Sequence, residues 1–186
     1  MQLSDWAQDH ARALLSPLGQ RWRHAQAVAK VAQELSRLLD NDDAEALIAS
    51  AYLHDVGYAG ELIDSGFHPL DGARHLAAID QGRLAGLVAH HSGARHEAEL
   101  RGLQDELADF KDEQTIVSAA LAYCDLTTGP DGAAVSPRHR LRDVESRYGE
   151  DSPVAAGLVA AWPEVMEAVA EVEDLLAKAS ALDHPT

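Results

Sequence analysis

The chain has 186 residues, of which 46% are hydrophobic and 25% charged, as is typical of a single globular domain with its own core. Its formal net charge of −16 disfavours long nucleic acids and anionic membranes as partners, but a small phosphorylated ligand is compatible with a site that holds cations. No apolar run is expected to reach the ~20 residues that span a bilayer. Residues 1–6 lack a signal-peptide pattern, and the single cysteine, Cys124, fits a reducing compartment, so a cytoplasmic location is expected.

Apolar residues recur at helical spacing through the first half of the chain. They predict helices at about 3–15, 20–39, 44–56, 68–80 and 83–91. The third of these is apolar nearly all round and should be the buried centre of the domain. Gly57 is expected to end it, which would leave His54 and Asp55 side by side at its C-terminal end.

The second half of the chain begins with a strongly charged stretch, 94–113, which predicts a short surface helix and a loop. An apolar helix at 113–126, a basic helix at 137–148 and an amphipathic helix at 153–179 should follow, and Pro163 should kink or split the last one. No strand pattern or repeat is present. The sequence predicts an all-α, single-domain bundle of about seven to nine helices. Its core would span 20–126, with an N-terminal helix within 1–19 and C-terminal helices at 137–180 packed on the core.

Four acidic or imidazole side chains lie near the ends of otherwise apolar helices: His24, His54, Asp55 and Asp125. Imidazole nitrogen together with carboxylate oxygen suits Mn, Fe, Co, Ni or Zn better than calcium. One such residue in a helix is more often structural than functional, but this ordered combination is hard to explain as core or as solvated surface. We therefore expect a metal site where these helix ends meet.

Three more histidines, His68, His90 and His91, fall at predicted helix ends between Asp55 and Asp125. They could complete a second site, so one or two divalent ions per chain are expected. Two neighbouring ions can stabilise both the attacking and the leaving oxygen of a displacement, and a bound ion makes hydroxide available near neutral pH.

The ordered set His24, His54-Asp55 and Asp125 resembles the HD-domain superfamily of metal-dependent phosphohydrolases over about residues 20–126. The intervening His68-Pro69 and His90-His91 resemble the extra ligands of its five-histidine, dinuclear branches. Those branches include symmetrical dinucleoside-tetraphosphate hydrolases and the HD-GYP cyclic-dinucleotide phosphodiesterases.

By position, the resemblance implies that His24, His54, Asp55 and Asp125 hold a first metal, with Asp55 bridging to a second. It implies that His68 and His90 hold that second metal. His91 is left as a third-site ligand, a proton donor or a group that supports a ligand.

The sequence departs from those branches at three places. One is His91, where the dinucleoside-tetraphosphate hydrolases commonly have threonine after the histidine. Ser92-Gly93-Ala94 follows the paired histidines, where HD-GYP enzymes carry Gly-Tyr-Pro. Tyr58 stands where they often have a lysine, so the charge of a substrate must be met elsewhere.

Three arginines in one basic helix, Arg138, Arg140 and Arg142, are candidates for substrate binding because guanidinium forks match phosphate oxygens. The alternative is a solvated helix face that balances charge. Thr128 could line the pocket or cap a turn. Arg21 and Arg23, near the start of the helix that carries His24, are weaker candidates.

Together these features predict a metal-dependent phosphohydrolase that acts on a nucleotide or other small phosphate ester through metal-activated water. Asp55 would bridge the ions and His91 could protonate the leaving oxygen. Two alternatives stay open: a mixed-valent di-iron oxygenase of the HD type, and a non-catalytic nucleotide-sensing module. The oligomeric state is left open.

Overall fold

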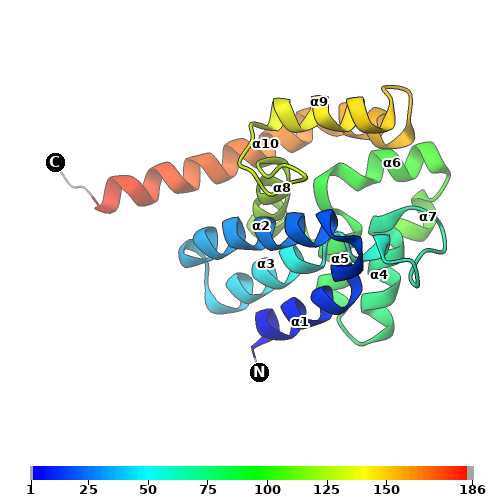
Figure 1. Ribbon diagram of the computed structural model, residues 1–186. Coiled ribbons are helices and arrows are strands. Elements are labelled where there is room, and N and C mark those ends of the chain that lie inside the picture. Colours follow the sequence, from blue (N-terminus) through cyan, green and yellow to red (C-terminus); the bar gives the residue numbers. More distant parts are fainter. Residues whose placement is uncertain (1, 184–186) are drawn as a thin grey trace.

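The computed structural model describes residues 2–183 as ten α-helices joined by short loops and 3₁₀ turns (Figure 1). Within those residues no strand is present, and one isolated bridge joins Thr128 to Ala134. The expected all-α architecture is confirmed. Nine of the helices have eight or more residues, and α7 has four.

The first three helices form one side of the bundle. They are α1 (Leu3–Leu15), α2 (Gln20–Leu35) and α3 (Asn41–Leu53), and α3 packs against α1, α2, α5 and α8. The α3 helix begins earlier than expected because the Asp40 carboxylate caps it by accepting a 3.0 Å hydrogen bond from the Asp43 amide. Its alanine and leucine side chains are buried on several faces, as the sequence indicates for a central helix.

The α3 helix ends at Leu53, before His54, and Gly57 does not end it. Gly57 lies instead in a 3₁₀ turn, Val56–Tyr58, against the first residues of α4 (His68–Ala78). A Cβ at position 57 would overlap the His68 carbonyl oxygen and lie 2.7 Å from the Gly72 amide nitrogen. The role expected for Gly57 is thus corrected: the missing side chain allows two backbones to approach closely and places His68 beside Asp55.

Next come α5 (Gly82–Ala89), which packs on α4, and then α6 (Ala94–Arg101) and α7 (Gln104–Leu107). The charged stretch 94–113 is more ordered than a single short helix and a loop. Ala98 and Leu107 are buried and tie it to the core, while its charged side chains lie mainly on the outside.

The chain closes with α8 (Ile116–Leu126), α9 (Pro137–Tyr148) and α10 (Pro153–Asp183). The last helix packs on α6, α8 and α9, and its C-terminal end extends away from the other helices in Figure 1. It continues through Pro163 and is not split there.

By length and composition alone, α10 is long and apolar enough between Pro153 and Leu182 to cross a membrane, although the sequence was expected to contain no such run. Core helices of proteins that never enter a membrane pass the same criterion. In the most apolar window of α10, 28% is buried against the rest of the protein.

Candidate metal centre

His24 reaches the centre of the bundle from the first turns of α2, where its side chain is buried. Its Nδ1 atom lies 3.0 Å from the Gly129 carbonyl oxygen, and its Nε2 lies 3.1 Å from Asp125 Oδ1. A carbonyl oxygen can only accept, so Nδ1 carries the ring proton and Nε2 of a neutral ring presents a lone pair. A lone pair and a carboxylate then face each other, which requires a cation or a second proton between them.

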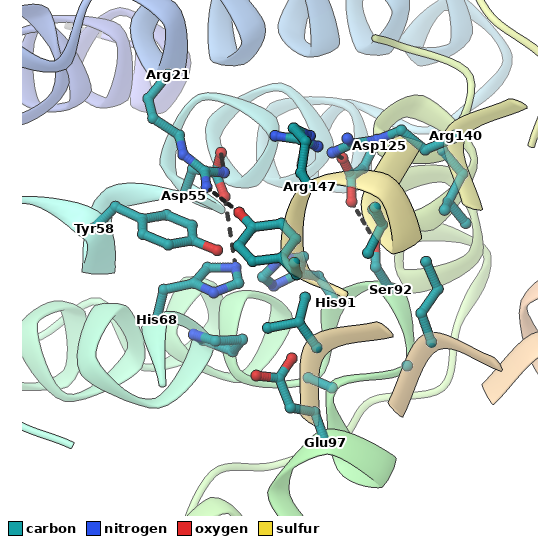
Figure 2. Close-up of a pocket in the computed structure, with 18 residues that line it drawn as sticks. Arg21, Asp55, Tyr58, His68, His91, Ser92, Glu97, Asp125, Arg140 and Arg147 are labelled. Atoms are coloured by element: carbon teal, nitrogen blue, oxygen red, sulfur yellow. Dashed lines mark hydrogen bonds and ion pairs between the residues drawn. The ribbon is translucent and has the colours of Figure 1, made fainter. Parts of the chain in front are cut away.

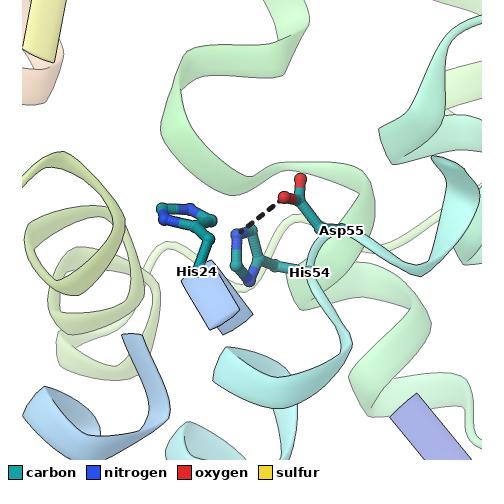
Figure 3. A group of neighbouring side chains, drawn as sticks. All are labelled: His24, His54 and Asp55. Atoms are coloured by element: carbon teal, nitrogen blue, oxygen red, sulfur yellow. Dashed lines mark ion pairs between the residues drawn. The ribbon is translucent and has the colours of Figure 1, made fainter. Parts of the chain in front are cut away.

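His54 and Asp55 follow α3 directly, and both are buried (Figure 3). His54 Nδ1 donates to the Ala51 carbonyl oxygen at 2.8 Å, the helical contact that fixes the ring. Its buried Nε2 has no hydrogen-bond partner in the described part of the chain. That atom lies 3.7 Å from Asp55 Oδ2 and 4.0 Å from Asp125 Oδ1. An unpartnered buried nitrogen is costly, and here it is directed between two carboxylates, as a metal ligand would be.

A second group shares Asp55 with the first. Ligand atoms of His24, His54 and Asp55 lie within 4.8 Å of one another, and so do those of Asp55, His68 and His91. His68 Nε2 is 3.5 Å from Asp55 Oδ1, while His54 Nε2 is on the Oδ2 side. The two oxygens of Asp55 therefore face different histidine sets, which is the arrangement that a bridging carboxylate needs.

The paired histidines after α5 face opposite ways, which corrects the expected assignment of the second site. His90 Nε2 bonds the Phe110 carbonyl oxygen at 2.9 Å, and His90 is absent from both ligand groups. His91 instead turns inward: it is buried, and its Nδ1 donates to the Val88 carbonyl oxygen at 2.6 Å. This leaves His91 Nε2 for the cluster. The rings of His90 and His91 point to different parts of the structure, and the sequence alone did not distinguish them.

Asp125, near the end of α8, is held from several sides. It accepts a 2.6 Å hydrogen bond from Ser92 Oγ and a 3.3 Å one from Arg140 Nη2. Ser92 has a left-handed backbone, with φ of 51°, in the turn that begins at His91. Neither contact was expected from the sequence, although the position of Ser92 next to the histidine pair was a usable signal.

The basic helix contributes one arginine of the three expected. Arg140 is buried against Asp125, whereas Arg138 and Arg142 are exposed and do not line the cavity beside the cluster. Helical geometry explains the difference, because residues two apart point to opposite faces. Thr128 is buried, and its hydroxyl donates to the Cys124 carbonyl oxygen at 2.7 Å; it does not line the cavity.

Arg21 connects the cluster to a set of aromatic rings. Its Nη1 donates to Asp55 Oδ2 at 3.1 Å and its Nη2 to the Tyr148 hydroxyl at 2.7 Å. The guanidinium lies 3.5 Å from the Tyr58 ring centroid, and that ring stacks on His68 at 4.1 Å. Arg21 precedes His24 by three residues, so both occur on one face of α2, a spacing visible in the sequence. No comparable spacing in the sequence indicated that Arg147 and Tyr148, at the end of α9, would lie near the cluster.

Burial and charge together set the protonation of the cluster. Desolvation lowers the pKa of His54 to about 4 and that of His68 well below its ordinary value, so both rings are neutral near pH 7. Burial alone would raise the pKa of Asp55, but the nearby His54 and Arg21 outweigh it. At Asp125 the neighbouring His24 and the charge of Arg140 likewise outweigh burial, and both carboxyl groups have pKa values below the ordinary range.

Neutral imidazoles with fixed Nδ1 protons and ionised carboxylates are the donor forms that divalent transition metals require. The residues present therefore fit one or two such ions, with Asp55 common to both groups.

Comparison with known proteins agrees with this geometry. The sequence model of the HD domain family matches residues 21–129, more than half of the chain. No curated protein and no solved structure matches the chain. The matched segment includes both ligand groups and Asp125 and ends before α9 and α10. The chain belongs to the HD domain family.

Proposed function

We propose that the chain is a metal-dependent phosphohydrolase that cleaves a nucleotide or other small phosphate ester. The observation that carries the proposal is the buried, unpartnered Nε2 of His54, which lies between the carboxylates of Asp55 and Asp125 in a chain of the HD domain family. A divalent ion held there would lower the pKa of a bound water and offset charge on phosphate oxygens.

The protein's own groups would keep the ligands ready. Arg21 and Arg140 keep Asp55 and Asp125 ionised, and Ser92 orients Asp125 through its hydroxyl. Supporting contacts of this kind usually change metal affinity or activity by about 10- to 100-fold when removed. With Nδ1 donating to a backbone carbonyl, His91 is better suited to hold a metal than to protonate a leaving group.

The test is to load purified protein with Mn²⁺ or Co²⁺ and to assay phosphate release from mononucleotides, dinucleoside polyphosphates, cyclic dinucleotides and small alkyl phosphates. We expect turnover of at least one class, and loss of both bound metal and turnover in His54→Ala and Asp55→Ala. His139→Ala, at an exposed histidine on α9, is the matched control. Normal turnover in the His54 and Asp55 variants would contradict the proposal.

Iron is compatible with the same donors, so the di-iron oxygenase alternative needs its own measurement. Oxygen consumption by iron-loaded protein in the presence of the same substrates, without phosphate release, would favour that alternative.

A further inference from the structure

A cavity of about 80 Å³ adjoins the two ligand groups. One wall carries ligand-group residues and Ser92, and the facing wall comes from α9 and α10. The α9 and α10 residues that line it are Arg140, Val144, Arg147, Tyr148, Val154 and Leu158. All six lie outside residues 21–129, which match the HD domain family. The part of the cavity that would contact the organic portion of a substrate is therefore built in part by segments that the family match does not cover.

The two sides of the cavity differ in charge. Figure 2 shows Arg21, Arg140 and Arg147 gathered with the carboxylates of the cluster on one side, and Glu97 on the other side of His68. Three guanidinium groups next to a metal centre suit the oxygens of one phosphate group. That end of the cavity would fix the phosphorus near the metal ligands.

Much of the remaining surface is apolar. It is formed by Pro69, Ala94, Leu126, Val144, Val154 and Leu158, together with the side chains of Tyr58 and Tyr148. Glu97 is buried at this end, and its Oε1 accepts from Arg101 Nε at 2.8 Å. A second anionic group on a ligand would lie against this carboxylate and the apolar wall, where charge is poorly solvated.

The size of the cavity also favours a ligand with a small organic group. A volume of about 80 Å³ corresponds to roughly six water-sized spheres. Pockets for drug-sized ligands have roughly 300–1,000 Å³. There is room for a phosphate group and a few carbon atoms, and a nucleoside would not be enclosed.

Resting on the proposed phosphohydrolase function, we propose that this cavity takes a phosphate monoester whose organic group is short, aliphatic and without negative charge. Val154 and Leu158 on α10 limit its length, and Glu97 on α6 rejects a second anionic group. Phosphate esters with a nucleoside or a carboxylate are poor ligands for it.

The first experiment compares turnover by the Mn²⁺-loaded full chain on n-propyl phosphate, 2′-deoxyadenosine 5′-monophosphate and 2-phosphoglycolate. We expect kcat/KM for n-propyl phosphate to be at least tenfold higher than for the other two. A preference for the nucleotide would overturn the inference and leave the phosphohydrolase proposal standing.

A second experiment measures binding without turnover, by titration calorimetry with n-propylphosphonate and phosphonoacetate. Tighter binding of n-propylphosphonate by tenfold or more supports the inference even if no ester is hydrolysed, in which case only the phosphohydrolase proposal fails. Equal affinity for the two phosphonates overturns the inference.

Variants on the apolar wall make the test specific. Val154→Phe should lower the affinity for n-propylphosphonate at least tenfold. Val154→Ala should shift the preference toward phosphonates with longer alkyl chains. Val159→Ala, at an exposed position on the same helix, is the control and should leave affinity within twofold. Glu97→Gln should tighten the binding of phosphonoacetate relative to that of n-propylphosphonate. Unchanged selectivity in both Val154→Phe and Glu97→Gln, with melting temperatures like that of the parent, would overturn the assignment of these residues.

Discussion

The backbone of Gly57 lies against that of His68 so closely that any side chain at position 57 would overlap the His68 carbonyl oxygen. This approach joins the turn after α3 to the start of α4, and it sets His68 Nε2 at 3.5 Å from Asp55 Oδ1. The glycine therefore acts on the candidate metal centre through the backbone and contributes no ligand atom.

Gly57→Ala should destabilise the protein and loosen the second ligand group. Overpacking of a close contact typically costs about 1–3 kcal/mol, so urea denaturation should show a lower free energy of unfolding by that order. Gly60→Ala is the matched control, because a Cβ at position 60 meets no atom of residues 2–183 within 4 Å. Equal stability of the two variants would show that the backbones can separate without cost.

His90 and His91 should differ sharply in their effect on metal content. His91→Ala removes a member of the second ligand group and should lower the metal count per chain in elemental analysis. His90→Ala should leave that count unchanged, because the His90 ring bonds the Phe110 carbonyl oxygen outside both groups. The opposite result would reverse the assignment of the pair.

Arg140→Ala should reduce kcat/KM, or metal affinity where no turnover is found, by about 10- to 100-fold, since it removes a supporting contact of Asp125. Arg138→Ala and Arg142→Ala change exposed positions of the same helix and should stay within about twofold. If all three variants lose activity alike, the role of the helix is a general electrostatic one, and the Arg140–Asp125 contact has no special importance.

Acid should destabilise the metal-free protein in a defined window. His54 has a pKa of about 4 in the folded state because it is buried, against an ordinary value of 6.5, so below pH 6.5 the unfolded chain binds a proton that the folded one does not. The free energy of unfolding is therefore unaffected by this group above pH 6.5, and it decreases by up to about 3 kcal/mol as the pH falls toward 4. Denaturation of the metal-free protein at a series of pH values measures this. His54→Gln should weaken the dependence of the free energy of unfolding on pH in this range. His139→Gln, at an exposed site, should leave that dependence unchanged.

Much of the fold was readable from local pattern. The helix 137–148 and the start of the helix at 68 have the expected bounds, because a serine cap or an early proline and the apolar spacing specify them without help from distant residues. The end of α3 was misplaced, because Gly57 is required by a distant backbone, and no local rule carries that information. Pro163 lies inside a continuous helix that packs on three others, where tertiary contacts outweigh the local penalty.

The sequence by itself determined the chemistry of the centre. Imidazoles and carboxylates at the ends of apolar helices predicted His24, His54, Asp55, His68 and Asp125, which the structure places near one another, but the same pattern also predicted His90, which lies outside both groups. Only the tertiary structure decided which neighbour of a pair faces the cluster and which arginines reach it. Those outcomes depend on how each helix is rotated about its axis, and packing against the other helices fixes that rotation. The wall that α9 and α10 add to the cavity was likewise decided by tertiary structure, because it joins residues far apart in the chain.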